Sequence, residues 1–170
     1  MQLRLDAVFD PTEVEDMGQA LGAADAQWRP GAETAGWHAR PVKRNQQLDR
    51  ASALHHQLAS RIVARLEAHP VLQAAVLPVR IHGLLFSRCG PGEGYGRHVD
   101  NAFMAHGRAD VSFTVFLTDP DSYGGGSLML EGPEGETAIR LKAGSAFVYP
   151  STWLHRVETV SHGERLVAVG

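Results

Sequence analysis

Two histidines and one aspartate form the pattern in this sequence that could support metal chemistry. His98 and Asp100 are separated by one residue, and His155 follows 55 residues after Asp100. In a β-strand, residues i and i+2 point to the same face, so the imidazole and the carboxylate of the first pair would converge. Two histidines and one carboxylate form the facial triad of non-haem Fe(II) oxygenases, which leaves positions open for substrate and O₂. The pattern predicts a metal centre held by His98, Asp100 and His155.

Arg165 adds a cation to this pattern, ten residues after His155 and at the start of an apolar run. A guanidinium in a buried strand is costly unless it meets an anion, and its parallel N–H donors fit a carboxylate. The formal charges of Fe²⁺, Asp100, a doubly charged 2-oxo acid and Arg165 cancel. We therefore predict that Arg165 binds a 2-oxo acid; the alternative is an exposed arginine paired with Glu164.

Taken one at a time, the same residues have plainer interpretations. His98 and Asp100 could be a hydrogen-bonded pair at a polar strand end, and His155 a structural histidine beside Trp153. Ser112 and Thr114 share one face of a predicted strand, where they either line the pocket beside Arg165 or face solvent. The combination of the triad with the arginine favours the metal site.

The elements that must position these residues are short strands. From Val79 onward, β-rich runs of five to eight residues alternate with Gly-rich turns. Seven or eight such strands, with no helices between them, predict a sandwich or jelly roll rather than a parallel βαβ sheet. The predicted strands cover residues 79–88, 95–100, 111–118, 127–131, 137–141 and 145–149, with a final pair around His162-Gly163.

The first part of the chain predicts two helices. Asp10 and Pro11 begin the first, whose apolar positions recur at i, i+3 and i+7. The second repeats Leu or Ile every four residues from Leu54 to Leu66, and Pro70 is expected to end it. Residues 37–48 are polar and are expected to be extended.

Composition limits the class of protein. The 170 residues fit one domain over 1–170, with a helical flank over about 1–75 and a jelly-roll core over about 76–170. A net charge of −3 argues against a nucleic-acid binder. The single cysteine, Cys89, cannot form an internal disulfide. No apolar run suits a signal peptide or a membrane span, so we expect a cytoplasmic protein.

Four ordered stretches carry a family resemblance that spans residues 40–166. They are VKRNQQL at 42–48, GYGRHVDNA at 94–102, FLTDPDSYGGG at 116–126 and YPSTWLHRV at 149–157. Together with Arg165 they resemble the PKHD-type hydroxylases, Fe(II)- and 2-oxoglutarate-dependent dioxygenases related to prolyl and lysyl hydroxylases. The resemblance implies a mainly β double-stranded β-helix (jelly roll) with N-terminal flanking helices. It also implies Fe(II) on His98, Asp100 and His155, and 2-oxoglutarate on Arg165.

The activity implied by the resemblance is hydroxylation of an unactivated C–H bond, with decarboxylation of 2-oxoglutarate to succinate. A peptidyl or other small substrate, L-ascorbate as reductant, a homo-oligomer and a role in iron homeostasis are implied in the same way. The chain departs from the pattern at Cys89, where relatives carry a pocket-lining tyrosine. It also stops at Gly170, inside an expected strand, where relatives continue with more strand and a helical tail.

Two other classes of protein remain open from the sequence. A cupin-like jelly-roll metal enzyme would not use 2-oxoglutarate, and Arg165 would then bind its substrate. A non-catalytic jelly-roll module would need no metal. Titration with metal, with and without 2-oxoglutarate, distinguishes the three.

Overall fold

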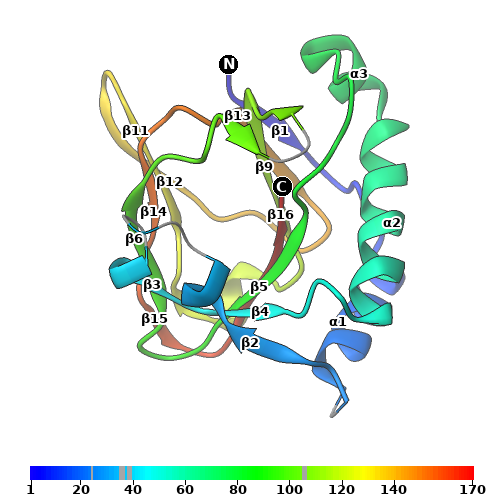
Figure 1. Ribbon diagram of the computed structural model, residues 1–170, viewed down its shortest axis with the longest axis vertical. Coiled ribbons are helices and arrows are strands. Elements are labelled where there is room, and N and C mark those ends of the chain that lie inside the picture. Colours follow the sequence, from blue (N-terminus) through cyan, green and yellow to red (C-terminus); the bar gives the residue numbers. More distant parts are fainter. Residues whose placement is uncertain (24, 35–36, 38–39, 105–106) are drawn as a thin grey trace.

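Two antiparallel sheets form the frame of the structure, a computed structural model that describes residues 1–170 except 24, 35–36, 38–39 and 105–106 (Figure 1). In spatial order, the larger sheet contains β1 (Leu3–Leu5), β13 (Ala146–Pro150), β9 (Val111–Phe116), β16 (Arg165–Val169), β5 (Leu85–Cys89), β4 (Gln46–Leu48) and β2 (Trp28–Pro30). The smaller contains β12 (Gly135–Ile139), β11 (Leu128–Gly132), β14 (His155–Val157), β6 (Gly94–His98) and β3 (Lys43–Arg44). Most neighbouring strands, unlike the β11–β12 hairpin, are far apart in the sequence, as in a jelly roll, and the predicted mainly β fold is confirmed.

Short elements connect these strands. Two-stranded pairs join β10 (Gly124–Gly125) to β15 (Val160–His162) and β7 (Phe103–Met104) to β8 (Gly107–Arg108). Single 3-10 turns occur at η1 (Gly31–Thr34), η2 (Arg40–Val42) and η3 (Pro120–Ser122).

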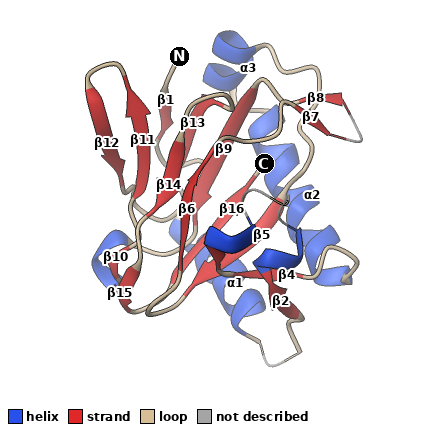
Figure 2. Cartoon of the chain, turned by 60° about the vertical axis from the view of Figure 1, so that its left-hand side comes forward, coloured by secondary structure: helices blue, strands red, loops and turns tan. Residues whose placement is uncertain are grey.

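Three helices cover the outer face of the larger sheet: α1 (Pro11–Gly22), α2 (Ala53–Glu67) and α3 (Pro70–Val76) (Figure 1; Figure 2, helices in blue). A capping box begins α1, because the Asp10 carboxylate accepts from the Glu13 backbone N–H and the Glu13 carboxylate accepts from that of Asp10. The two helices predicted from the sequence are confirmed. None of the helices among the described residues is long and apolar enough to cross a membrane.

Alternation along the strands separates two apolar layers. Between the helices and the larger sheet, Met17 and Ile62 pack with Phe86 and Val115 in one core cluster. Between the two sheets, a second cluster is made by Phe116, Leu128, Leu130, Leu141, Phe147, Tyr149 and Val167. Because successive strand residues point to opposite faces, the polar residues between the helix-facing ones point toward the space between the sheets.

The first 75 residues form the expected helical flank and also supply four strands that were not predicted. They contribute β1 to the edge of the larger sheet, β4 and β2 to its other edge, and β3 to the smaller sheet. These strands are two or three residues long, too short to show a period in the sequence. Residues 38 and 39 of the segment expected to be extended lie outside the described residues, and residues 40–42 form a 3-10 turn instead.

The structure also differs from the sequence prediction at Pro70 and over residues 79–88. Pro70 ends α2 as predicted, but it is also the first residue of α3, since proline suits the first helical position. Only residues 85–89 of the long predicted strand pair in a sheet.

Candidate active site

His98, Asp100 and His155 come together on one side of a cavity between the two sheets. The distance from His98 Nε2 to Asp100 Oδ1 is 3.8 Å, and from His155 Nε2 to Asp100 Oδ2 it is 3.7 Å. One possible ligand atom from each residue lies within 4.8 Å of the others. Ligand atoms bound about 2.0–2.2 Å from one ion lie roughly 3–4 Å apart, so the three side chains need only small adjustments to hold a metal.

The register between β6 and β14 places the two histidines. His155 and His98 are directly opposite each other, and their ring centroids are 4.1 Å apart. His155 is the first residue of β14, a strand absent from the sequence prediction. Asp100 lies just beyond the end of β6, where its backbone N–H donates to Ser151 O at 3.1 Å. A loop hydrogen bond, rather than strand alternation, therefore positions the carboxylate.

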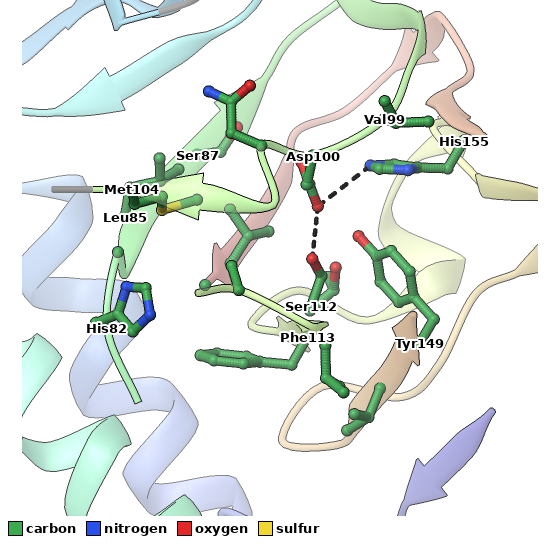
Figure 3. A pocket seen from close by; sticks show the side chains of 18 of the residues that line it. His82, Leu85, Ser87, Val99, Asp100, Met104, Ser112, Phe113, Tyr149 and His155 are labelled. Carbon is green, nitrogen blue, oxygen red and sulfur yellow. Dashed lines mark hydrogen bonds and ion pairs between the residues drawn. The ribbon is translucent and has the colours of Figure 1, made fainter. Parts of the chain in front are cut away.

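Hydrogen bonds also orient each of the three side chains. His98 Nδ1 lies 2.8 Å from Gly96 O, and His155 Nδ1 lies 2.9 Å from Trp153 O. A carbonyl only accepts, so each Nδ1 carries the hydrogen and each Nε2 presents its lone pair to the centre. Ser112 Oγ donates to Asp100 Oδ2 at 2.6 Å, and Figure 3 shows Asp100 between the Ser112 hydroxyl and the His155 ring.

Burial keeps the aromatic surroundings of the site neutral. Desolvation and the neighbouring His155 lower the pKa of His98, which favours the neutral imidazole that binds metals. Tyr95 stacks on His98 with a centroid distance of 3.6 Å, and burial raises the pKa of Tyr95 to about 12. Tyr149 meets His155 edge-on at 5.2 Å, and burial raises the pKa of Tyr149 as well.

Arg165 lies in the wall of the same cavity, at the start of β16. Its side chain is buried, with 2% of the residue exposed, and burial lowers its pKa. Among the described residues, no carboxylate lies within 4.0 Å of the guanidinium, and Nε has no hydrogen-bond partner. A buried guanidinium without an anion is costly, so this part of the cavity wall is suited to bind an anionic group.

Cys89 is directly opposite Arg165 in the β5–β16 pairing, and both residues line the cavity. Burial raises the pKa of the Cys89 thiol to about 11, which keeps it protonated. Where the resemblance leads us to expect a tyrosine hydroxyl, this chain presents a small neutral thiol.

Two further residues of the cavity were not assigned a role from the sequence. Lys43, on β3, is 9% exposed, and burial lowers its pKa to about 8. The alternation of Lys43, Asn45 and Gln47, which all line the cavity, was the pattern that could have revealed it. Ser112, left undecided between pocket and solvent, lies in the pocket wall and orients Asp100.

The cavity itself has a volume of about 1340 Å³. Ligand pockets commonly occupy about 300–1,000 Å³, so this space exceeds the needs of one small co-substrate. His98, Asp100 and His155 line it together with Arg165, and this common cavity fits a metal with an anionic organic ligand. This donor set suits Fe(II): it consists of two imidazoles and one carboxylate, and the Ser112 hydroxyl binds one oxygen of that carboxylate.

Comparison with known proteins supports the same kind of site. Residues 84–170 match the 2OG-Fe(II) oxygenase superfamily. A PKHD-type hydroxylase of Rippkaea orientalis is 52% identical over 173 residues, covering 100% of this chain and 77% of that protein. A prolyl-4-hydroxylase of Pseudomonas putida has a similar fold, with a TM-score of 0.72 and 21% identity over 99% of this chain and 89% of the other. HygX of Streptomyces hygroscopicus, solved with nickel and 2-oxoglutarate bound, gives a TM-score of 0.65 and 19% identity over 99% and 80% of the two chains.

Proposed function

The chain belongs to the PKHD-type hydroxylases of the 2OG-Fe(II) oxygenase superfamily, and on this premise we propose that His98, Asp100 and His155 hold its Fe(II) while Arg165 holds the far carboxylate of 2-oxoglutarate. The protein is an oxidoreductase, and the cupin-like alternative is not favoured. When bound, Fe(II) supplies the O₂ activation that converts 2-oxoglutarate to succinate and CO₂ and hydroxylates a C–H bond of the substrate.

The observation that carries the metal assignment is the convergence of three ligand atoms within 4.8 Å. The Gly96 and Trp153 carbonyls fix the two rings by accepting their Nδ1 hydrogens, and the Ser112 hydroxyl fixes the carboxylate. Side chains held in this way need little reorganisation to bind a metal, and such supporting bonds tune both affinity and geometry.

The co-substrate assignment depends on Arg165. Its guanidinium is buried in the cavity wall without a carboxylate partner among the described residues. The metal would take one end of 2-oxoglutarate and Arg165 the other, so each charged end would have a partner. Two parallel N–H donors select a carboxylate over a neutral group, because the neutral group would leave the guanidinium unpaired.

The remaining features of the reaction are proposed on the family resemblance. We infer a small-molecule or peptidyl substrate, since one similar fold belongs to a prolyl-4-hydroxylase. L-ascorbate as a reductant and assembly into a homo-oligomer are inferred from the resemblance to the PKHD-type hydroxylases alone.

Anaerobic titration with Mn(II), with and without 2-oxoglutarate, tests the proposal. We expect Mn(II) to bind, and 2-oxoglutarate to bind only when Mn(II) is present. Metal binding without any effect on 2-oxoglutarate would indicate a cupin-like metal enzyme. Binding of neither ligand would indicate a jelly-roll module and would refute the proposal.

A further inference from the structure

A second buried cation, Lys43, lies in the wall of the active-site cavity. In the pairing of β3 with β6, Lys43 is opposite Tyr95, and Lys43 Nζ lies 5.0 Å from the centroid of the Tyr95 ring. Tyr95 stacks in turn on His98. The ammonium group is therefore separated from a candidate metal ligand by a single aromatic ring.

The ammonium group is short of partners in the described part of the chain. Its one hydrogen bond runs from Lys43 Nζ to Thr34 Oγ1 at 3.3 Å, and no carboxylate lies within 4.0 Å. A lysine ammonium has three donors, so two are free to meet a ligand. With the residue only 9% exposed, bulk water cannot replace that ligand fully.

With Fe(II) and 2-oxoglutarate bound, the positive charge of Lys43 would have no negative counterpart in the site. The charges of Fe²⁺, Asp100, 2-oxoglutarate and Arg165 cancel, and Lys43 then adds one positive charge. Cys89 does not supply an anion, because burial raises the pKa of its thiol. A carboxylate on another molecule would supply the negative charge that matches Lys43.

The cavity has room for that molecule. Its volume of about 1340 Å³ exceeds that of common single-ligand pockets. Arg165 belongs to the larger sheet and Lys43 to the smaller one, so the two cations line different walls. The metal and Arg165 already account for both charged ends of 2-oxoglutarate.

We propose that Lys43 binds a carboxylate of the primary substrate, so that this hydroxylase acts on a carboxylic acid, either a small acid or a peptide that presents a carboxylate. This inference rests on the proposed function and adds the chemical class of the substrate. Lys43 selects the acid because a neutral analogue leaves a buried ammonium unpaired.

The lysine content of the chain allows a direct test. Lys43 and Lys142 are the only two lysines, and Lys142 is exposed. Protein with ¹³C-labelled lysine, loaded with Zn(II) and 2-oxoglutarate so that no turnover occurs, gives one side-chain signal from the site and one internal control. The probes are N-acetylated proline, leucine and alanine, each as the free acid and as the carboxamide.

We expect at least one free acid to shift the Lys43 signal and to bind at least about tenfold more tightly than its amide, with no shift at Lys142. Lys43→Met should remove this preference, and Lys43→Arg should retain most of it. The dissociation constant of 2-oxoglutarate should stay within about threefold of wild type in Lys43→Met.

Three results would overturn the proposal: no acid that binds better than its amide, a preference that survives in Lys43→Met, or 2-oxoglutarate binding weakened about tenfold or more in Lys43→Met. The last would assign Lys43 to the co-substrate. Should wild-type protein bind no 2-oxoglutarate, the proposed function fails, and the acid-over-amide comparison on the Zn(II) protein alone still decides the role of Lys43.

Discussion

Ser112 and Asp100, on different segments of the chain, share a hydrogen bond of 2.6 Å from Ser112 Oγ to Asp100 Oδ2. Ser112 belongs to β9 of the larger sheet, and Asp100 follows β6 of the smaller one. The bond therefore links the two sheets at the candidate metal site. Among the described residues no hydrogen-bond donor reaches Asp100 Oδ1, and the bond to Oδ2 directs the carboxylate toward the two histidines.

Ser112→Ala should weaken metal binding about 10–100-fold, because the carboxylate loses the group that orients it. The dissociation constant of Mn(II) measures this effect, and Ser161→Ala, at an exposed position, is the matched control. Unchanged Mn(II) affinity in a folded Ser112→Ala protein would show that the hydrogen bond does not position the ligand.

Asp100→Ala should abolish metal binding, with a loss of affinity greater than about 100-fold, since it removes a ligand rather than a supporting group. Electron paramagnetic resonance of free Mn(II) measures the bound fraction. Asp121→Ala, an exposed aspartate on η3, should bind as wild type does. Retained affinity in Asp100→Ala would contradict the assigned triad.

Arg165→Met should weaken 2-oxoglutarate binding about 10–100-fold and leave Mn(II) binding intact. Arg165→Lys keeps the charge but loses the two parallel donors, so its affinity should fall between those of wild type and Arg165→Met. Calorimetry under anaerobic conditions gives the constants. The control is Arg29→Met, since Arg29 pairs with Asp49 at the surface. Equal affinities across the Arg165 series would exclude this arginine from co-substrate binding.

The stability of the metal-free protein should depend on Lys43 at alkaline pH. Burial lowers its pKa from 10.5 to about 8, so between these values the unfolded chain binds more protons than the native chain. The free energy of unfolding therefore rises with pH across this window, by up to about 3 kcal/mol. Below pH 8 the ammonium is charged in both states, so the cost of burying it is constant.

Urea denaturation at pH 7.5, 9 and 10.5 measures this dependence. Lys43→Met should gain stability over wild type at pH 7.5, and the difference should shrink toward pH 10.5. Lys142→Met should follow wild type at every pH. A pH-independent difference for Lys43→Met would show that the ammonium is not desolvated.

Cys89 should resist alkylation in the native protein. Burial raises the pKa of its thiol from 9.0 to about 11, so the thiolate fraction at pH 8 falls about 100-fold. Iodoacetamide should therefore react at least that much more slowly before unfolding than after it, as followed by mass spectrometry. A native rate close to the unfolded rate would place the thiol in solvent.

The sequence predicted that His98, Asp100 and His155 converge, because two histidines and one carboxylate form a recognised ligand set. The strand alternation expected to place Asp100 was wrong, since a loop hydrogen bond to Ser151 O positions it instead. The sequence could not predict that Ser112 bonds to Asp100, since that contact depends on how the two sheets pack.

Arg165 was predictable because a charged residue opens an apolar strand. No role was predicted for Lys43, because its alternation with Asn45 and Gln47 was the one available signal: β3 has only two residues, and no apolar run marks its burial.

The strands of the N-terminal part show the same limit. β1 joins the larger sheet by pairing with β13, about 140 residues further along the chain. A strand of three residues shows no hydrophobic period from which such a partner could be predicted. The helix α3 was missed because proline is compatible with both the end of one helix and the start of the next.

The direct pairing of His98 with His155 across β6 and β14 has a consequence for folding. Side chains alternate along a strand, so a slip of one residue would turn one imidazole away from the cavity. The native register offers both rings to a single ion. A divalent metal present during refolding would therefore favour this register over registers shifted by one residue. The metal site would then act as a check on strand alignment before it acts in catalysis.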